Sequence, residues 1–243
     1  MVVYEVVLGA VSLCAILSCT RQSPRMKDFL YWICAGGIII ASALRSTDIG
    51  ADTLTYCREY QNIRTLSFKD AMEFRWEQGY VAVNWVLGQF FESERALLVF
   101  LTIFILVPIF VWIKKESNYP LLSLVMFIGM GMWNASIGIF RQWCAIAILT
   151  FSYKYIKARR FIPFLMVVLI AMLFHRTAAI FLLAYFVEGI PLNMNTIIAA
   201  VPASVMVGLM GDKILNFLNK FARISEEGNF NGGISLLIVL WLC

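Results

Sequence analysis

The stretch RSTDIGADT, residues 45–53, opens a polar loop that extends to Tyr80, and the rest of the chain is arranged around this loop. The sequence on both sides is mostly apolar, whereas the loop holds charged residues of both signs. The basic ones are Arg45, Arg58, Arg64, Lys69 and Arg75, and the acidic ones are Asp48, Asp52, Glu59, Asp70, Glu73 and Glu77. Because charges need water or partners, their concentration predicts a hydrated site in the loop of residues 45–79.

The same loop carries signals for short helices. Gly50 permits a tight turn, and either Asp52 or Thr53 can cap a helix that ends near residue 63. Ser67 and Asp70 have the spacing of a capping box, which predicts the start of a second short helix. We therefore expect this loop to be folded.

The composition indicates a membrane protein. Apolar residues make up 61% of the 243 residues, charged residues only 14%, and the mean hydropathy is +0.80. These values lie far from the balance of soluble domains and predict an all-α, polytopic integral membrane protein with a single membrane domain over residues 1–243. The net charge of +5 comes from short basic clusters between apolar runs, so nucleic acid is not an expected partner.

The six cysteines have the spacing of neither a metal site nor a disulfide framework. Five of them lie in or at the edge of apolar runs, where cysteine usually acts as a small packing residue. We expect no metal site and no cofactor.

Several apolar runs approach the length of about 20 residues that a membrane-spanning helix needs. They cover residues 2–18, 29–44, 96–113, 121–137, 141–156, 161–187 and 197–210. Basic clusters follow some of these runs, namely Arg21–Lys27, Lys114–Lys115 and Lys157–Arg160, and such clusters favour the cytoplasmic side. The loop of residues 45–79 is then extracytoplasmic.

The run Tyr80–Phe91 is apolar but short. As a helix it would cover roughly 18 Å, less than the roughly 30 Å of a bilayer's hydrocarbon core. If it crossed, Lys114–Lys115 and Lys157–Arg160 would both lie outside, whereas a re-entrant or interfacial helix keeps both clusters inside. We favour the re-entrant or interfacial helix over a thin, tilted crossing.

The C-terminal third has two irregularities. His175 and Arg176 interrupt the run of residues 161–187, which predicts either one long tilted helix or two short helices that meet at this pair. Beyond a second polar loop at residues 212–233, the last apolar run, residues 234–243, is too short to cross a membrane. We expect the chain to be truncated within a helix.

Two polar pairs lie where apolar sequence is expected. Arg141 and Gln142 begin a span directly after Gly138, and an arginine beside the free N–H groups of a helix N-terminus suits an anion such as phosphate. Alternatively, Arg141 only extends to the membrane interface.

His175, the only histidine, forms an ionisable pair with Arg176 inside an apolar run, which predicts a functional site. Alternatively, His175 is structural and bonded to a backbone carbonyl.

The loop carboxylates nearest the membrane are Asp48, Asp52 and Glu77. Most loop charges are expected to be solvated, but Glu77 leads directly into the short apolar run, which favours a role for it. The charged candidates are expected to share one extracytoplasmic cavity, formed by Arg45, Asp52, Glu77, Arg141 and His175.

Four segments resemble the EpsG family, bacterial polymerases of exopolysaccharide and capsule that are grouped with the Wzy-type O-antigen polymerases. They are RSTDIGADTLTY at 45–56, EQGY at 77–80, FRQ at 140–142 and FH at 174–175, in the order and at the spacing of the family. The resemblance covers residues 29–190. Two departures are Gln78, where the family often has proline, and the shorter chain.

The resemblance implies a glycosyltransferase C-like helical bundle in the bacterial cytoplasmic membrane. Such a protein joins glycan repeat units carried on undecaprenyl diphosphate at the outer membrane face, with membrane lipid, a chain-length regulator and a flippase as partners. The acceptor hydroxyl needs a base, for which His175, Glu77 and Asp52 are the candidates. Cations would stabilise the leaving diphosphate, and the implied substrate-binding set is Arg45, Asp48, Thr53, Tyr56, Arg141, Gln142 and Arg176.

Two other classes of protein stay open at this point. A flippase for the same lipid-linked sugars would also need arginines and a carboxylate, but it would distribute charges through its spans, whereas here they concentrate on one side. An integral-membrane acyltransferase that modifies a polysaccharide would use His175 as its catalytic residue. That alternative leaves the motif at residues 45–56 unexplained.

Overall fold

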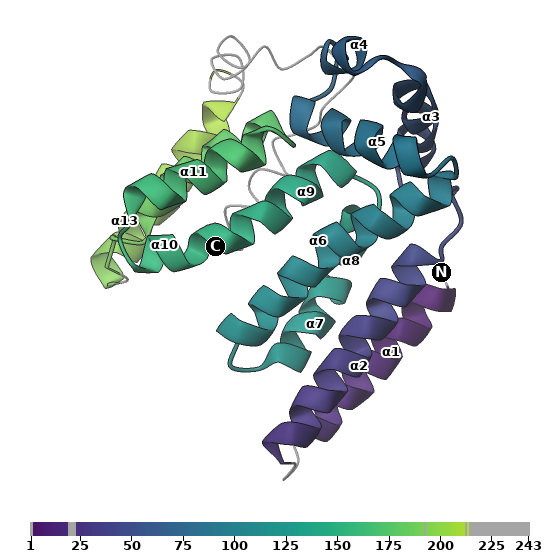
Figure 1. Ribbon diagram of the computed structural model, residues 1–243. Coiled ribbons are helices and arrows are strands. Elements are labelled where there is room, and N and C mark those ends of the chain that lie inside the picture. Colours follow the sequence, from purple (N-terminus) through teal and green to yellow (C-terminus); the bar gives the residue numbers. More distant parts are fainter. Residues whose placement is uncertain (1, 19–22, 192, 212, 214–243) are drawn as a thin grey trace. The chain divides into compact units, whose positions relative to one another are not determined.

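The computed structural model of the chain is built from helices (Figure 1). It describes residues 2–18, 23–191, 193–211 and 213, and every regular element in these ranges is helical, as the sequence predicts. The chain forms two compact units, which divide after Leu182. The first unit holds all of the candidate site residues and is described first.

The antiparallel helices α2 (Pro24–Ala43) and α6 (Glu94–Glu116) define two ends of the first unit. Lys114 near the end of α6 forms an ion pair with Asp28 near the start of α2. At the other end, Arg95 Nη1 donates to the carbonyl of Ala43 at 3.3 Å. We call these the basic end, marked by Asp28 and Lys114, and the loop end, marked by Ala43 and Arg95. Among the described residues, α2 and α6 are the helices long and apolar enough to cross a membrane by themselves.

Three shorter helices lie between α2 and α6 in the sequence and gather at the loop end (Figure 1): α3 (Thr53–Thr65), α4 (Phe68–Met72) and α5 (Gln78–Phe90). The Tyr60 hydroxyl of α3 donates to the carbonyl of Phe91 at 2.6 Å, which ties the end of α5 to α3. Because the chain leaves α2 and enters α6 at the loop end, α5 does not run the length of this pair. The re-entrant or interfacial path expected for Tyr80–Phe91 stays a prediction.

The expected span at residues 121–137 is broken, which corrects the sequence-based prediction. It forms α7 (Pro120–Gly129) and α8 (Met132–Ser136), separated by a turn at Gly131, whose φ is +78°. A left-handed residue cannot continue an α-helix, and glycine adopts that conformation without steric cost. The N-terminal helix α1 (Val2–Ser18) lies beside α2 and α7, and its Tyr4 ring stacks on Trp133 of α8.

The next segments return to the basic end and then back again. Helix α9 (Phe140–Leu149), the turn η1 (Thr150–Ser152) and α10 (Tyr153–Lys157) end where Lys157 Nζ pairs with Glu116 at 2.9 Å. The basic clusters Lys114–Lys115 and Lys157–Arg160 thus share one end, as expected. Helix α11 (Phe161–Met172) returns to the loop end and stops before His175, where η2 (Arg176–Phe181) begins. The run of residues 161–187 therefore forms separate short helices that meet at the His175–Arg176 pair.

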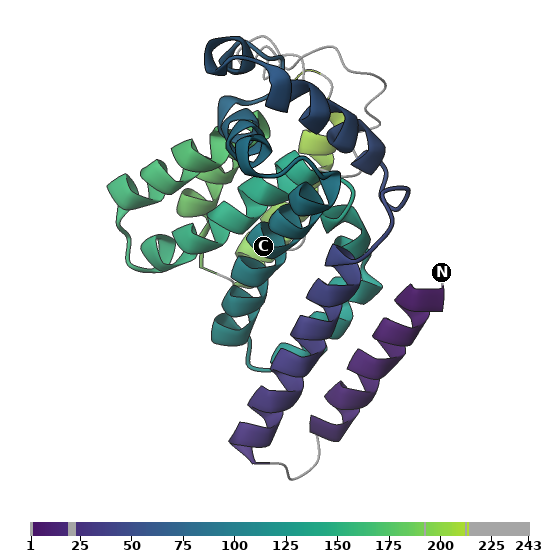
Figure 2. The ribbon, with the colours of Figure 1, turned by 45° about the vertical axis from the view of Figure 1, so that its right-hand side comes forward.

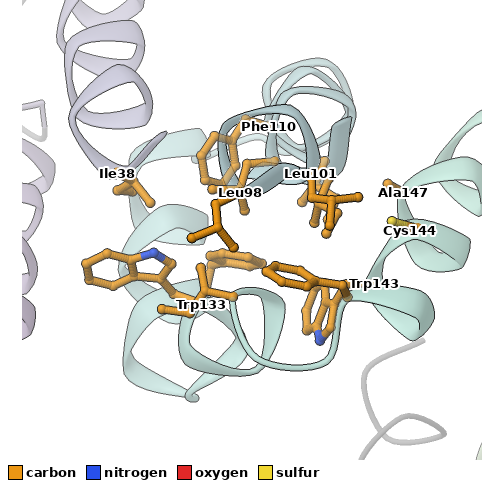
Figure 3. Packing of buried hydrophobic residues seen from close by; sticks show 14 of the residues in the cluster. Ile38, Leu98, Leu101, Phe110, Trp133, Trp143, Cys144 and Ala147 are labelled. Carbon is orange, nitrogen blue, oxygen red and sulfur yellow. The ribbon is translucent and has the colours of Figure 1, made fainter. Parts of the chain in front are cut away.

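The core of the first unit fixes α9 against α6 (Figure 3). Leu101 of α6 lies on the side of Trp143, Cys144 and Ala147 of α9, and Leu98 and Phe110 of α6 lie toward Ile38 of α2 and Trp133 of α8. Inside a membrane, such side chains associate mainly through close packing, since lipid tails are equally apolar. This packing determines where α9 begins at the loop end.

Helices α1 and α2 run side by side (Figure 2), and both expose large apolar side chains. On α2, Phe29, Ile33 and Ile40 recur at helical spacing, and each exposes more than half of its surface. Such a stripe is typical of a helix that faces lipid.

The second unit is described by itself. It contains the rest of α12 (Leu182–Val187) and α13 (Met194–Leu209). Asn193 accepts from the Thr196 N–H at 2.9 Å, and the Thr196 hydroxyl accepts from the Asn193 N–H, so a capping box starts α13. This helix corresponds to the run expected at residues 197–210. The expected polar loop at 212–233, apart from Lys213, and the run at 234–243 lie outside the described residues.

Candidate functional site

The carboxylate of Glu77 is the point where three segments of the first unit meet. Arg141 Nη1 of α9 donates to Glu77 Oε2 at 2.9 Å, and the backbone N–H of Arg176 donates to Oε1 at 3.3 Å. The His175 Nδ1 atom lies 3.4 Å from Oε1. Only 9% of the Glu77 side chain is exposed. Three of the residues expected in one cavity, Glu77, Arg141 and His175, are therefore in contact.

Because Gly79 has no side chain, the start of α5 can approach the residues between the end of α11 and His175. The N–H groups of Gly79 and Tyr80 both donate to the carbonyl of Leu173, at 2.9 and 3.3 Å. A Cβ atom on Gly79 would lie 2.8 Å from the same carbonyl oxygen. The EQGY motif thus has a structural explanation, because Glu77 and Gly79 both hold α5 against the residues that follow α11.

The local charges keep Glu77 ionised. Burial by itself would raise the pKa of Glu77, but the adjacent His175 imidazole and Arg141 guanidinium lower it to about 2. The carboxylate is then negatively charged at neutral pH, and it can orient a cation or an N–H group beside it. Glu77 is consequently suited to positioning its neighbours and is a poor proton acceptor.

Aromatic residues surround the Arg141 guanidinium. Its central carbon lies 5.0 Å from the ring centre of Trp76, within the range of cation–π contacts. Tyr56, buried on α3, interacts with the same guanidinium and packs on Trp76 and Phe140. Trp76 is not among the residues expected from the sequence, although it directly precedes Glu77. Its role depends on a contact with α9 that local sequence does not specify.

Several buried polar atoms around this cluster have no hydrogen-bond partner in the described part of the chain. They are Nε of Arg141, Nε1 of Trp76 and the hydroxyl of Tyr80. Leaving a buried polar group unpaired costs about 1–3 kcal/mol, so such atoms usually meet water or a ligand. His175 and Arg141 still expose 25% and 21% of their side chains, and they form the accessible side of the cluster.

Arg45 and Thr53 have a different environment from the one expected. Arg45 is only 6% exposed, and its guanidinium donates to the carbonyls of Ser42 and Ile137. Thr53 is fully buried, and its hydroxyl contacts the carbonyl of Ile137 at 3.2 Å. Arg45 lies near Arg141 in the fold, since it stacks on Phe140, but its donors already have partners within the protein. The structure therefore does not support a role for Arg45 in binding a diphosphate.

The remaining expected site residues, Asp48, Asp52, Gln142 and Arg176, differ in their exposure and contacts. Asp48 is exposed and accepts from the Ser46 hydroxyl at 3.1 Å. Asp52 occupies the N-cap position of α3, but its exposed side chain makes no capping bond, contrary to one of the two expectations. Gln142 is half-buried beside Arg141, and the side chain of Arg176 is exposed while its backbone bonds Glu77.

Comparison with known proteins identifies the family. No curated protein and no solved structure matches the chain. A model of the EpsG family matches residues 28–236, which is most of the chain and includes Glu77, Arg141 and His175. The chain therefore belongs to the EpsG family.

Proposed function

We propose that this protein polymerises glycan repeat units that are linked through a diphosphate to a membrane lipid, undecaprenol, in the synthesis of exopolysaccharide, capsule or O-antigen. Membership of the EpsG family supports polysaccharide polymerisation at a membrane. The lipid-linked donor and the glycosyltransferase C-like class are part of the proposal. The observation that carries it is the contact of Glu77 with a histidine and an arginine at one partly open position.

In this reaction His175 is the general base. Glu77 faces Nδ1 of the imidazole, so the carboxylate favours the tautomer with a proton on Nδ1 and leaves Nε2 free to accept one. A sugar hydroxyl of the acceptor then transfers its proton to Nε2 and its oxygen attacks the anomeric carbon of the donor. A base positioned in this way contributes typically 10²–10⁴-fold to the rate.

The leaving group is the lipid diphosphate, which keeps the electron pair of the broken carbon–oxygen bond. Arg141 is placed to stabilise its growing negative charge, because its Nε–H is a buried donor without an acceptor in the described chain. Arg176 supplies a second cation for the same diphosphate, because its backbone N–H bonds Glu77 while its side chain is exposed. No role of this kind is proposed for Arg45.

The proposed orientation puts the site at the outer face of the bacterial cytoplasmic membrane. Lys114, Lys157 and their neighbours cluster at the basic end, and basic clusters favour the cytoplasm. The loop end, with Glu77, then faces outward. A flippase would deliver the lipid-linked units to this face, and a chain-length regulator would act on the growing polymer.

The test compares turnover of purified, lipid-linked repeat units by the wild type and two variants in lipid nanodiscs. His175→Asn keeps an amide beside Glu77 but provides no base, so turnover should fall by about 10²–10⁴-fold. Arg141→Lys keeps the charge but loses the planar guanidinium group with its paired N–H donors, and turnover should fall by about 10²–10³-fold. Arg64→Lys is the matched control, because Arg64 pairs with the exposed Glu92 on the loop surface, and it should keep full turnover.

The fate of the lipid-linked units in cells separates the proposed polymerase from the rival classes. A defective polymerase leaves single units at the outer face of the membrane, whereas a defective flippase leaves them at the inner face. Full turnover with both His175→Asn and Arg141→Lys would refute the assignment of the site.

A further inference from the structure

We propose that Arg45 and Thr53 are positioning residues, which clamp the turn between α8 and α9 and thereby hold Arg141 against Glu77. The clamp is a structural device and is testable by itself. Its consequence for turnover rests on the proposed function.

The Arg45 guanidinium joins four separate parts of the first unit. Nη1 donates to the carbonyl of Ser42 at the end of α2 and contacts the Thr102 hydroxyl of α6 at 3.4 Å. Nε donates to the carbonyl of Ile49 at 3.4 Å, and Nη2 donates to the carbonyl of Ile137 at 2.9 Å. These acceptors occupy the planar fork, so Arg45 acts on the fold and not on a ligand.

The carbonyl of Ile137 is the point that the clamp holds. It follows α8, and the last carbonyls of a helix have no partner within the helix. Here Ile137 accepts from Arg45 Nη2 at 2.9 Å. The Thr53 hydroxyl lies between two carbonyls, that of Ile49 at 2.9 Å and that of Ile137 at 3.2 Å, and shares its single proton between them. Two donors from the loop end of the chain thus fix the turn that precedes α9.

Two glycines bring the loop backbone onto the same turn. Gly50 has a φ of +111°, and a Cβ atom there would lie 2.7 Å from the Ile137 carbonyl oxygen. A Cβ atom on Gly138 would lie 3.0 Å from the backbone nitrogen of Ala51. The loop and the turn are therefore in direct contact, with no room for side chains at these two positions.

Phe140 transmits the position of the clamp to Arg141. Its fully buried ring lies between the Arg45 guanidinium, at 5.3 Å, and the Tyr56 ring, at 5.1 Å. Arg141 is the next residue and bonds Glu77 at 2.9 Å. Because a misplacement of about 1 Å can cost about 10²-fold in rate, a looser turn would weaken turnover without removing any group that touches the substrate.

The first test measures hydrogen–deuterium exchange in nanodiscs and does not depend on activity. Thr53→Val keeps the side-chain shape and removes the hydroxyl, whereas Thr53→Ser keeps it. Loss of the hydroxyl shared by the carbonyls of Ile49 and Ile137 should speed exchange of residues 137–143 about fivefold in Thr53→Val and leave α6 and the Thr53→Ser variant unchanged. Thr65→Val is the matched control, because the Thr65 hydroxyl bonds Asn62 at the far end of α3.

The second test measures turnover of lipid-linked repeat units. Thr53→Val should lower turnover about tenfold or more, Thr53→Ser should retain it, and adding Thr53→Val to Arg141→Ala should cause no further loss, because both act through Arg141. Unchanged exchange at 137–143 in Thr53→Val overturns the clamp whatever the activity. Faster exchange with full turnover, or fully additive losses in the double variant, overturns the positioning role. If His175→Asn and Arg141→Lys keep full turnover, the proposed function fails, while the exchange comparison still decides the clamp.

Discussion

Replacing Glu77 by glutamine removes the charge at the centre of the candidate site while nearly conserving its shape. The carboxylate receives Arg141 at 2.9 Å and the N–H of Arg176 at 3.3 Å, and its side chain is 9% exposed. The lowering of the Glu77 pKa from 4.5 to about 2 corresponds at most to about 3 kcal/mol. Because Arg141 is partly solvated, screening reduces this value, and we expect Glu77→Gln to lose about 2 kcal/mol of stability.

The effect should depend on pH in a defined direction. Since the folded protein lowers the pKa of Glu77, the ionised carboxylate stabilises the fold at pH values above 4.5. That contribution is lost as the pH falls from 4.5 toward 2, where the carboxylate becomes protonated in the folded state as well. The stability difference between the wild type and Glu77→Gln should therefore be complete at pH 7 and smaller at pH 3.

The assay is equilibrium unfolding in detergent micelles at both pH values. Glu59→Gln is the matched control, because Glu59 pairs with Arg75 at 2.9 Å but Arg75 is half-exposed. A surface pair of this kind contributes at most about 1 kcal/mol. Equal stability of Glu77→Gln and the wild type at pH 7, or a difference that stays constant between pH 7 and pH 3, would refute the reasoning.

Two further predictions concern the packing of α5 and the direction of the chain. Gly79→Ala places a methyl group 2.8 Å from the Leu173 carbonyl oxygen and should lower the free energy of unfolding by about 1–3 kcal/mol. The control is Gly36→Ala on α2, where no atom lies within 4 Å, and it should not destabilise the protein. Equal effects of the two changes would contradict the close approach of α5 to Leu173. Single cysteines introduced at the exposed positions Ser93, after α5, and Asn118, after α6, should react with an impermeant thiol reagent from opposite sides of the membrane, with position 93 labelled from outside. Labelling of position 93 from the cytoplasm alone would show that α5 crosses the membrane.

Features set by neighbouring residues are predictable from this sequence. Gly50 adopts the left-handed conformation of its expected turn, α3 begins at Thr53, and Ser67 caps α4 by accepting from the Asp70 N–H at 3.2 Å. The helix break at His175 is one of the two alternatives that the ionisable pair in an apolar run predicts. Each of these signals acts over a few residues, so the local sequence is sufficient to specify it.

Features that depend on distant partners are not predictable in the same way. The acceptor of Arg45 Nη2 is a backbone carbonyl 92 residues away, and any residue type at position 137 would supply it. The sequence therefore predicts a buried or interfacial cation at Arg45 but not which acceptors it meets. The break at Gly131 is similarly hidden, because glycine is common in apolar spans and the run of residues 121–137 shows no change in composition.

The contacts of Glu77 also explain how one carboxylate can serve both the resting protein and the proposed reaction. In the structure its charge is matched by Arg141. In the proposed reaction, Arg141 keeps its Nη1 bond to Glu77 while it stabilises the diphosphate, and when His175 takes the acceptor's proton, the new imidazolium charge forms 3.4 Å from Glu77. Glu77 then has a cationic neighbour throughout, which avoids the high cost of an unpaired buried charge.

The added charge on His175 during the proposed reaction predicts that Glu77 matters more for turnover than for folding. A protein with 5–15 kcal/mol of stability stays folded after a loss of about 2 kcal/mol, so unfolding cannot account for a large loss of activity in Glu77→Gln. We expect turnover to fall by at least about 10²-fold, because the variant can no longer stabilise the imidazolium. Turnover of Glu77→Gln near the wild-type value, measured on folded protein at pH 7, would show that His175 does not accept the proton beside Glu77.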